Sequence, residues 1–281
     1  MYSPKEYWSN LADHGNPTDD AGFAPILHPL APPWFNRLTD NLQFRAVKRA
    51  LAIAEVPYGA RILDVGCGTG RWVRRYKELG FSSVGVDATF GMLRIARTNK
   101  TTDPLTVGMA QSLPFSDSAF DCLSDITVIQ HISYDQQFKA IQEMVRVVRP
   151  GGWLIFMEVI SGKDPSKAKD SHVFPREPKD WIKEVEKCGA VLVNWFGQEF
   201  LLADRLYVHM AQALYNRKRG LVHQVQSASY VGSAESSFTQ RAYWKIRHFM
   251  VPVSFWMEPL TEKVCPPSAA THGVFVFQKS I

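Results

Sequence analysis

The sequence of 281 residues contains no long apolar run and no close pair of cysteines. Its longest apolar runs, such as Trp153 to Met157, are far shorter than the roughly 18–20 residues that cross a bilayer. The first residues lack a basic region followed by an apolar stretch, which argues against secretion. The wide separation of the cysteines argues against a disulfide framework and a zinc site. They are Cys67, Cys122, Cys188 and Cys265. We therefore expect a cytoplasmic protein with reduced thiols, no metal and no membrane partner.

Repeats, low-complexity tracts and a strong charge of one sign are also absent. Apolar residues make up 46% of the chain and charged residues 21%, which excludes disordered and fibrous classes of protein. The net charge of +5 lies in residues 201–281, where nine Lys and Arg stand against four Asp and Glu. The dense basic run Arg217 to Arg219 precedes Gly220, and there cations offset the dipole of a predicted helix end. Nucleic acid is therefore disfavoured as a partner.

Strand and helix patterns alternate along the chain. Apolar strand patterns occur at residues 61–65, 83–87, 105–109, 121–125, 153–159, 190–196 and 273–278. Helical spacing of apolar residues occurs at 41–55, 70–79, 89–98, 136–148 and 180–187. This alternation predicts an α/β fold, in which a parallel sheet is covered on both faces and binds ligands at the carboxyl ends of its strands.

Four segments follow from this pattern. Residues 1–40 are rich in proline, glycine and aromatics and predict an N-terminal covering segment. Residues 41–196 form the predicted core, and residues 272–281 supply its final strand. Residues 197–271 are too many for a structureless loop, so they predict an inserted, mainly helical lid. Its first helix is expected to carry the apolar stripe Leu202, Leu206, Met210 and Leu214.

The strongest chemical signal is a strand that enters a glycine-rich turn, Asp64 to Gly70, with the sequence Asp-Val-Gly-Cys-Gly-Thr-Gly. Glycine lets the backbone approach a ligand closely at such a turn. Arg71 occupies the place of the third glycine of a dinucleotide fingerprint, which disfavours a nicotinamide or flavin cofactor. Asp87 ends the next strand, where a carboxylate can accept both ribose hydroxyls of an adenosyl group. The alternative role for Asp87 is that of a helix N-cap.

Five motifs in order extend this signal over about residues 60–160. They are Leu63–Gly70, Val84–Asp87, Leu113–Asp121, Val128–His131 and Glu143–Gly152. In these motifs the chain resembles the class I S-adenosylmethionine-dependent methyltransferases, in particular the branch of quinone C-methyltransferases. The resemblance implies a Rossmann-like, doubly wound sheet of seven strands, mostly parallel, with an antiparallel last strand. It also implies S-adenosylmethionine (SAM) as cofactor and S-adenosylhomocysteine as product, with no metal.

The resemblance also assigns the cofactor contacts. It places the glycine turn beside the methionine moiety, Ala110 and Gln111 beside the adenine, and Asp125 near the methionine amino group. The full set is Asp64, Gly66, Cys67, Gly68, Gly70, Asp87, Ala88, Met92, Ala110, Gln111, Ser112, Asp125 and Gln130. Many relatives carry Asp in place of Met109, where it contacts the adenine amino group. Adenine recognition here is therefore expected to depend on backbone groups and apolar contacts.

Two side chains are candidates for chemistry. Direct displacement at a sulfonium methyl needs alignment and exclusion of water, and a hydroxyl or protonated amine acceptor also needs a base within hydrogen-bond reach. His131 follows the fourth core strand at the cofactor end of the sheet and is the leading candidate for this base. Its alternative role is to cap a turn or fill space. Glu158 ends the fifth strand at the same edge and is expected to face the acceptor, with a surface carboxylate as the alternative.

Aromatic residues are concentrated in the predicted lid. Residues 230–256 contain seven aromatics, well above the 12% share in the whole chain. Either an apolar or planar acceptor pocket or a small core within the lid explains this concentration. The candidate substrate contacts are Tyr243, Trp244 and Trp256, together with Tyr7 and Trp8, which resemble residues that close over the cofactor.

These observations predict a SAM-dependent methyltransferase that transfers a methyl group to an oxygen, nitrogen or carbon atom of a small molecule, in particular an aromatic or apolar metabolite. Two alternatives stay open. One is a methyltransferase that acts on RNA or protein, although the residues from Asp125 onward do not form an Asn-Pro-Pro-Tyr-type tetrad. The other is a SAM-binding protein that catalyses a different reaction or acts as a scaffold. Oligomerisation is neither indicated nor excluded.

Overall fold

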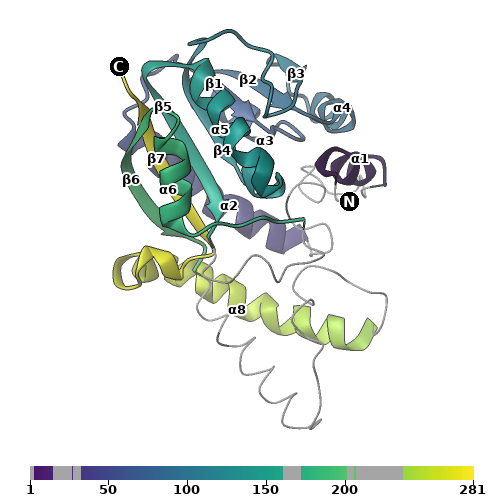
Figure 1. Cartoon of the computed structure of the whole chain (residues 1–281). Helices are drawn as coiled ribbons and strands as arrows, with labels where there is room; N and C mark the ends of the chain where they lie inside the picture. Colours follow the sequence, from purple (N-terminus) through teal and green to yellow (C-terminus); the bar gives the residue numbers. More distant parts are fainter. Residues whose placement is uncertain (1–2, 15–26, 28–32, 161–171, 201–205, 207–236) are drawn as a thin grey trace.

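A seven-stranded sheet runs through the middle of the molecule (Figure 1). The computed structural model describes residues 3–14, 27, 33–160, 172–200, 206 and 237–281, and of residues 237–247 the backbone alone. The strands are β1 (Arg61–Val65), β2 (Ser82–Asp87), β3 (Leu105–Val107), β4 (Phe120–Ile126), β5 (Val148–Val159), β6 (Ala190–Gln198) and β7 (His272–Lys279). Their order across the sheet is β3-β2-β1-β4-β5-β7-β6.

The sheet is parallel except for its last strand. β1 pairs in parallel with β2 and β4, β2 pairs with β3, and β4 pairs with β5. β7 runs antiparallel between β5 and β6. This topology confirms the predicted Rossmann-like α/β fold. Because the strand order reverses between β1 and β4, the loops that leave these two strands diverge and open a crevice at their carboxyl ends.

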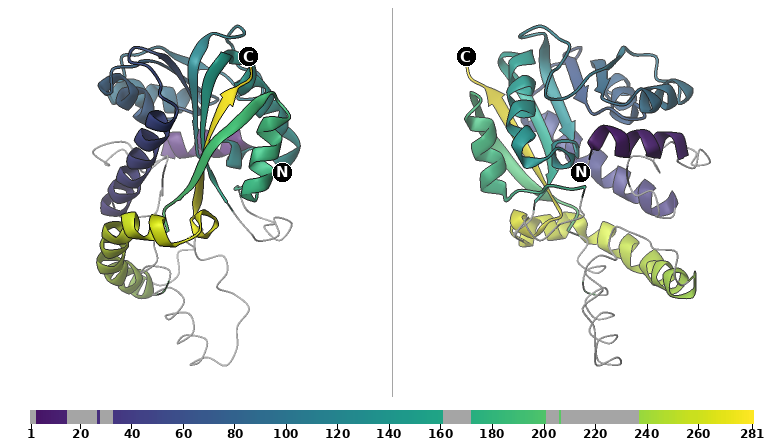
Figure 2. Two further views of the ribbon diagram at one scale, coloured as in Figure 1. Left: turned by 90° about the vertical axis from the view of Figure 1, so that its left-hand side faces the viewer. Right: turned by 45° about the vertical axis from the view of Figure 1, so that its right-hand side comes forward.

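Helices cover both faces of the sheet (Figure 2). They are α1 (Pro4–His14), α2 (Pro33–Ile53), α3 (Arg71–Glu78), α4 (Phe90–Thr98), α5 (Tyr134–Val147), α6 (Pro178–Glu186) and α8 (Ser237–Val264), with short 3-10 turns η1 (Ile129–His131) and η3 (Pro267–Ala269). α2 and α3 pack on one face through Ala50 and Trp72. α5 and α6 pack on the other through Ile141 and Trp181. The central strands are therefore buried on both sides, as a parallel sheet requires.

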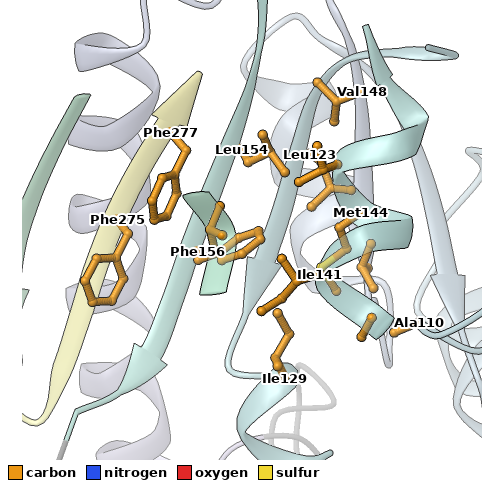
Figure 3. Packing of buried hydrophobic residues seen from close by; sticks show 14 of the residues in the cluster. Ala110, Leu123, Ile129, Ile141, Met144, Val148, Leu154, Phe156, Phe275 and Phe277 are labelled. Carbon is orange, nitrogen blue, oxygen red and sulfur yellow. The ribbon is translucent and has the colours of Figure 1, made fainter. Parts of the chain in front are cut away.

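The core on the α5 side is rich in phenylalanine (Figure 3). The rings of Phe156 on β5 and Phe277 on β7 lie 5.8 Å apart between centroids, and Phe275 lies 6.3 Å from Phe277. Ile141 and Met144 of α5 are buried in the same cluster. The contact between β5 and β7 thus joins the antiparallel strand to the parallel part of the sheet.

The N-terminal helices depart from the sequence pattern. The sequence predicts an irregular segment before Asn41, yet α1 is helical and α2 begins at Pro33. The first turns of α2 bury the polar residues Asn36, Thr39 and Asp40, so apolar spacing does not reveal the helix. The division of the chain at residues 40, 196 and 271 stays a prediction.

The predicted lid contains α8 and η3 among the described residues. The predicted helix with the stripe Leu202 to Leu214 lies outside them, apart from Leu206, which is exposed. None of the described helices combines the length and hydropathy needed to cross a bilayer.

Phe156→Ala tests the central core. Phe156 is 1% exposed, so the change removes a buried ring and leaves a cavity between β5, β7 and α5, which costs about 3–5 kcal/mol of unfolding free energy. Val193→Ala on the edge strand β6, where the valine is 48% exposed, is the matched control and should stay within about 0.5 kcal/mol. Urea unfolding of both variants measures the difference, and equal stabilities would contradict this packing.

Candidate active site

A pocket lies at the carboxyl ends of β1, β2 and β4. α1 forms one side of it through Pro4, Lys5 and Trp8. The rest of its lining comes from the strand ends and the loops that follow them. These residues are Val65, Gly66, Cys67, Gly68, Arg71, Trp72, Asp87, Ala88, Thr89, Met92, Gly108, Met109, Ala110, Gln111, Ile126, Thr127, Val128, His131 and Ile132. The pocket therefore occupies the ligand position expected of an open α/β sheet.

The turn after β1 exposes backbone to this pocket. Gly66 and Gly68 adopt φ angles of +64° and +50°. A Cβ on Gly66 would lie 2.5 and 2.6 Å from the two Cγ atoms of Val128, so the loop after β4 also requires glycine here. The N–H of Cys67 donates to the carbonyl of Val86 at 3.0 Å and ties the turn to β2. The turn, β2 and the loop after β4 thus fit closely together.

Asp87 links the loops after β1 and β2. Its Oδ2 accepts a hydrogen bond from the N–H of Gly68 at 2.9 Å, and its Oδ1 accepts from the N–H of Thr89 at 2.8 Å. Burial raises the pKa of Asp87, and these two N–H donors oppose that rise. The carboxylate also lines the pocket and has lone pairs left for hydroxyl donors. Asp87 therefore combines a local role near the start of α4 with a place in the pocket.

Two buried ionisable side chains beside the turn keep atoms without partners in the described part of the chain. Oδ1 of Asp64 accepts from Oγ of Ser124 at 3.0 Å, whereas Oδ2 has no partner. Nη1 of Arg71 donates to Asp40 at 2.9 Å, and Arg75 contacts the same carboxylate, whereas Nε of Arg71 has no partner. Burial raises the pKa of Asp64 to about 8 and lowers the pKa of Arg71. The ammonium and carboxylate of an α-amino acid are the groups that would complete this pair.

Glu158 does not face the pocket. It is fully buried and accepts the N–H groups of Val128, Ile129 and Gln130 at 3.0, 3.1 and 2.9 Å. The expectation that Glu158 faces an acceptor is therefore wrong, because three backbone donors after β4 hold its carboxylate inside. Burial and the neighbouring carboxyl of Asp125 raise the pKa of Glu158, and burial raises the pKa of Asp125 to about 7. Two ionised carboxylates would repel in this dry site, so the pair keeps a proton near neutral pH.

His131 lines the pocket in its neutral form. Its Nδ1–H donates to the carbonyl oxygen of His172 at 2.9 Å, which leaves the lone pair on Nε2. The side-chain amide of Gln130 lies 3.4 Å from this Nε2. Burial lowers the pKa of His131 to about 4. The geometry thus gives His131 a fixed tautomer with an acceptor atom on Nε2.

The aromatic residues predicted to contact the substrate lie at different places relative to the pocket. Trp8 lines the pocket, with its ring edge-on to His131 at 5.1 Å. Tyr7 lies outside the lining and stacks on His172 at 4.6 Å. Trp256 is 82% exposed and does not line the pocket, so its role as a substrate contact stays a prediction without support from this pocket. It points outward because α8 packs on its neighbours with the opposite face. The side chains of Tyr243 and Trp244 lie outside the described part of the structure.

Eight of the thirteen predicted cofactor residues line the pocket, and five do not. Those that line it are Gly66, Cys67, Gly68, Asp87, Ala88, Met92, Ala110 and Gln111. Those that do not are Asp64, Gly70, Ser112, Asp125 and Gln130. Gln130 is buried, and its Oε1 accepts the N–H of Val159 at 2.7 Å, which ties the loop after β4 to the end of β5. The roles of all thirteen in binding stay predictions.

The pocket also contains residues that the sequence analysis missed. Arg71 and Trp72 open α3 directly after the glycine turn, a position that could have marked both as pocket residues. Thr127 lines the pocket with a φ of +62°, which is unusual for a β-branched residue and has no sequence signal. Within the described residues, no cluster of His, Cys, Asp and Glu is arranged to hold a metal ion.

Known sequences match the part of the chain that builds this pocket. Residues 63–156 match the family described as "Methyltransferase domain". The demethylmenaquinone methyltransferase of Renibacterium salmoninarum is 35% identical over 38% of this chain and 44% of its own length. The malonyl-[acyl-carrier protein] O-methyltransferase of Pectobacterium atrosepticum is 33% identical over 43% of this chain and 47% of its own length. The human protein named "Probable tRNA methyltransferase 9B" is 35% identical over 44% of this chain and 26% of its own length.

The chain thus spans less than half the length of these curated relatives. Among solved structures, a complex of the Haloferax volcanii Trm112 methyltransferase activator with a methyltransferase superposes with a TM-score of 0.58. That match covers 98% of both chains at 14% identity and supports the fold alone. Residues 63–156, which contain the glycine turn, are thus similar in sequence to methyltransferase domains.

Proposed function

We propose that the chain is an enzyme that transfers the methyl group of SAM to a small molecule. The observation that carries the proposal is the pocket itself, in which the glycine turn and Asp87 lie at the carboxyl ends of the strands, beside Trp8 of α1. A helix against the pocket leaves space for a small acceptor more readily than for a folded protein or an RNA duplex.

The buried polar groups support SAM as the cofactor. Asp87 offers a carboxylate to ribose hydroxyls, as such a residue does at the end of the second strand of nucleotide-binding sheets. The unpartnered Nε of Arg71, which lines the pocket, matches the carboxylate of the methionine moiety, and the unpartnered Oδ2 of Asp64, outside the lining, offers an acceptor to its ammonium. Met92 and Ala88 provide an apolar wall for an adenine ring. Asp87, Arg71, Met92 and Ala88 thus place polar and apolar partners for one cofactor along one pocket.

SAM supplies an electrophilic methyl group, and the protein's task is to align an acceptor and exclude water. Trp8, Ile126 and Ile132 provide apolar surface for this exclusion. His131 lines the same pocket with a neutral ring, and its Nε2 can take a proton from an acceptor hydroxyl or amine as the new bond forms, provided that the acceptor displaces the amide of Gln130. An acceptor carbon that is already nucleophilic would need only the alignment.

The acceptor class is a planar or apolar small molecule. Trp8 packs edge-on against His131 at 5.1 Å, and both rings line the pocket, where they can contact a planar or apolar acceptor. Two of the curated relatives are named for small or carrier-bound acceptors, demethylmenaquinone and malonyl-[acyl-carrier protein]. Their names differ in acceptor, so they support small acceptors as a class and not one compound.

Transfer of labelled methyl from SAM tests this function. The full chain is incubated with an extract of its source organism, which is then separated into small-molecule, protein and RNA fractions. We expect label in the small-molecule fraction because the acceptor site lies beside α1. Label confined to RNA, or to proteins other than acyl carriers, would contradict the acceptor class. No labelled product from a sample that binds SAM would contradict methyl transfer itself.

Arg71→Gln should weaken binding of the amino-acid end of the cofactor. Loss of one charge-assisted hydrogen bond reduces the affinity for S-adenosylhomocysteine by about tenfold to 100-fold. The affinity for 5′-methylthioadenosine, which lacks the amino-acid end, should stay unchanged. Calorimetric titration measures both ligands. Lys77→Gln, an exposed cation on the same helix, is the matched control. Equal losses for both ligands would refute the role of Arg71.

His131→Ala should lower kcat by about 100-fold or more while the affinity for SAM changes little. The assay is methyl transfer to the identified acceptor. Because the neutral imidazole is the active form and the pKa of His131 is about 4, the rate of the wild-type enzyme should rise with pH through about 4. It should then be level across the ordinary histidine range. An unchanged kcat in the variant would leave His131 a packing residue.

A further inference from the structure

α8 has its polar and apolar faces reversed relative to an ordinary surface helix. The face that packs on the rest of the molecule buries Ser254, Glu258 and Thr261 beside Val251. The outward face carries large apolar side chains with high exposed fractions. They are Phe249 at 73%, Val253 at 47%, Trp256 at 82%, Leu260 at 58% and Val264 at 69%. A surface helix normally turns its apolar stripe toward the core.

These five side chains form one continuous stripe, called the outer stripe below. They follow one another at intervals of three or four residues, so they share one side of the helix. From Phe249 to Val264 the stripe extends for about 22 Å at 1.5 Å per residue. A stripe of this length that includes Trp and Phe is more than scattered surface residues, and it marks a site of interaction.

The charges around the outer stripe are basic. The two carboxylates of this part of α8 already have partners. Glu258 is buried and accepts a hydrogen bond from the N–H of Phe200 at 2.8 Å. Glu262 lies 3.8 and 3.3 Å from the guanidinium groups of Arg45 and Arg49 on α2. One carboxylate is thus paired with two guanidinium groups, which leaves one positive charge in excess. Lys263 is exposed next to Val264. In the sequence of α8, Lys245 stands four residues before Phe249, at the spacing of the outer stripe.

The helix also lies at the end of the sheet where the pocket opens. α8 leads through η3 into β7, whose first residue, His272, pairs with Val159 at the carboxyl end of β5. Figure 1 shows α8 crossing the molecule at the end toward which the parallel strands point. A partner bound to the outer stripe would therefore lie on the same side of the molecule as the pocket.

We propose that the outer stripe of α8 rests on an anionic lipid surface, with its aromatic and aliphatic side chains in the interface and the basic residues near the headgroups. Charge complementarity decides for this partner, because an apolar helix face flanked by Lys and Arg is the pattern of interfacial helices. A second copy of the chain would set one basic flank against another. The contact is peripheral, so it agrees with the lack of a described membrane-spanning helix, but it departs from the expectation of no membrane partner.

Vesicle sedimentation of the full chain tests the proposal. The probes are vesicles of phosphatidylcholine alone and of two parts phosphatidylcholine with one part phosphatidylglycerol. We expect the chain to sediment with the anionic vesicles only, and about 0.5 M salt should weaken this binding because it screens the basic residues. The double variant Phe249→Ser, Trp256→Ser should bind at least about tenfold more weakly, since it removes two rings from the interface.

Tyr58→Ser is the matched control, because Tyr58 is an aromatic residue that is 87% exposed outside α8. It should bind vesicles as the wild type does, and thermal unfolding should show that both variants stay folded. Absence of vesicle binding, or equal binding by the double variant and the wild type, overturns the proposal. A dimer that the double variant abolishes, without vesicle binding, would assign the outer stripe to a second copy. Unchanged SAM binding in the double variant separates this test from the proposed function.

Discussion

The hydrogen bond from the N–H of Gly68 to the carboxylate of Asp87, at 2.9 Å, fixes the two loops on which the pocket depends. It draws the glycine turn after β1 against the end of β2, where the N–H of Cys67 also meets the carbonyl of Val86. The loop after β4 closes on the other side, since Val128 leaves no room for a side chain at position 66. One half-buried carboxylate thus organises the backbone that a nucleoside ligand would contact.

Two other carboxyls, the buried Glu158 and the partly exposed Glu143, hold further loops in place. Glu158 accepts hydrogen bonds from three backbone N–H groups after β4. Glu143 accepts a hydrogen bond from the N–H of Leu113 at 2.8 Å beside the loop after β3. Burial of Glu158 costs desolvation, which its three backbone donors offset, whereas Glu143 is also paired with Arg146 at 2.7 Å. The carboxylates that the sequence offers as candidates for binding or catalysis therefore fall into two groups. Some line the pocket, and others hold its loops.

Much of the fold was predictable from the sequence because it depends on periodicity and glycine. The alternating strands and the Gly-x-Gly-x-Gly turn predicted the sheet, the crevice and the place of Asp87. The orientation of Glu158 was not predictable, because it depends on three N–H groups of a loop whose conformation no pattern encodes. The start of α2 was hidden by its buried polar residues, such as Asp40, which pairs with Arg71 across the fold. The exposure of Trp256 on α8 was not predictable either, because an exposed aromatic and a pocket aromatic look alike in a sequence.

Titration of the full chain with S-adenosylhomocysteine, compared between the wild type and Asp87→Ala, tests the central claim most directly. Glu186→Ala, which removes an exposed carboxylate at the end of α6, is the matched control, and unfolding curves establish that all three proteins are folded. The account predicts one binding site per chain in the wild type and the control, and an affinity about tenfold to 100-fold lower in Asp87→Ala. Equal affinity in all three proteins would contradict it.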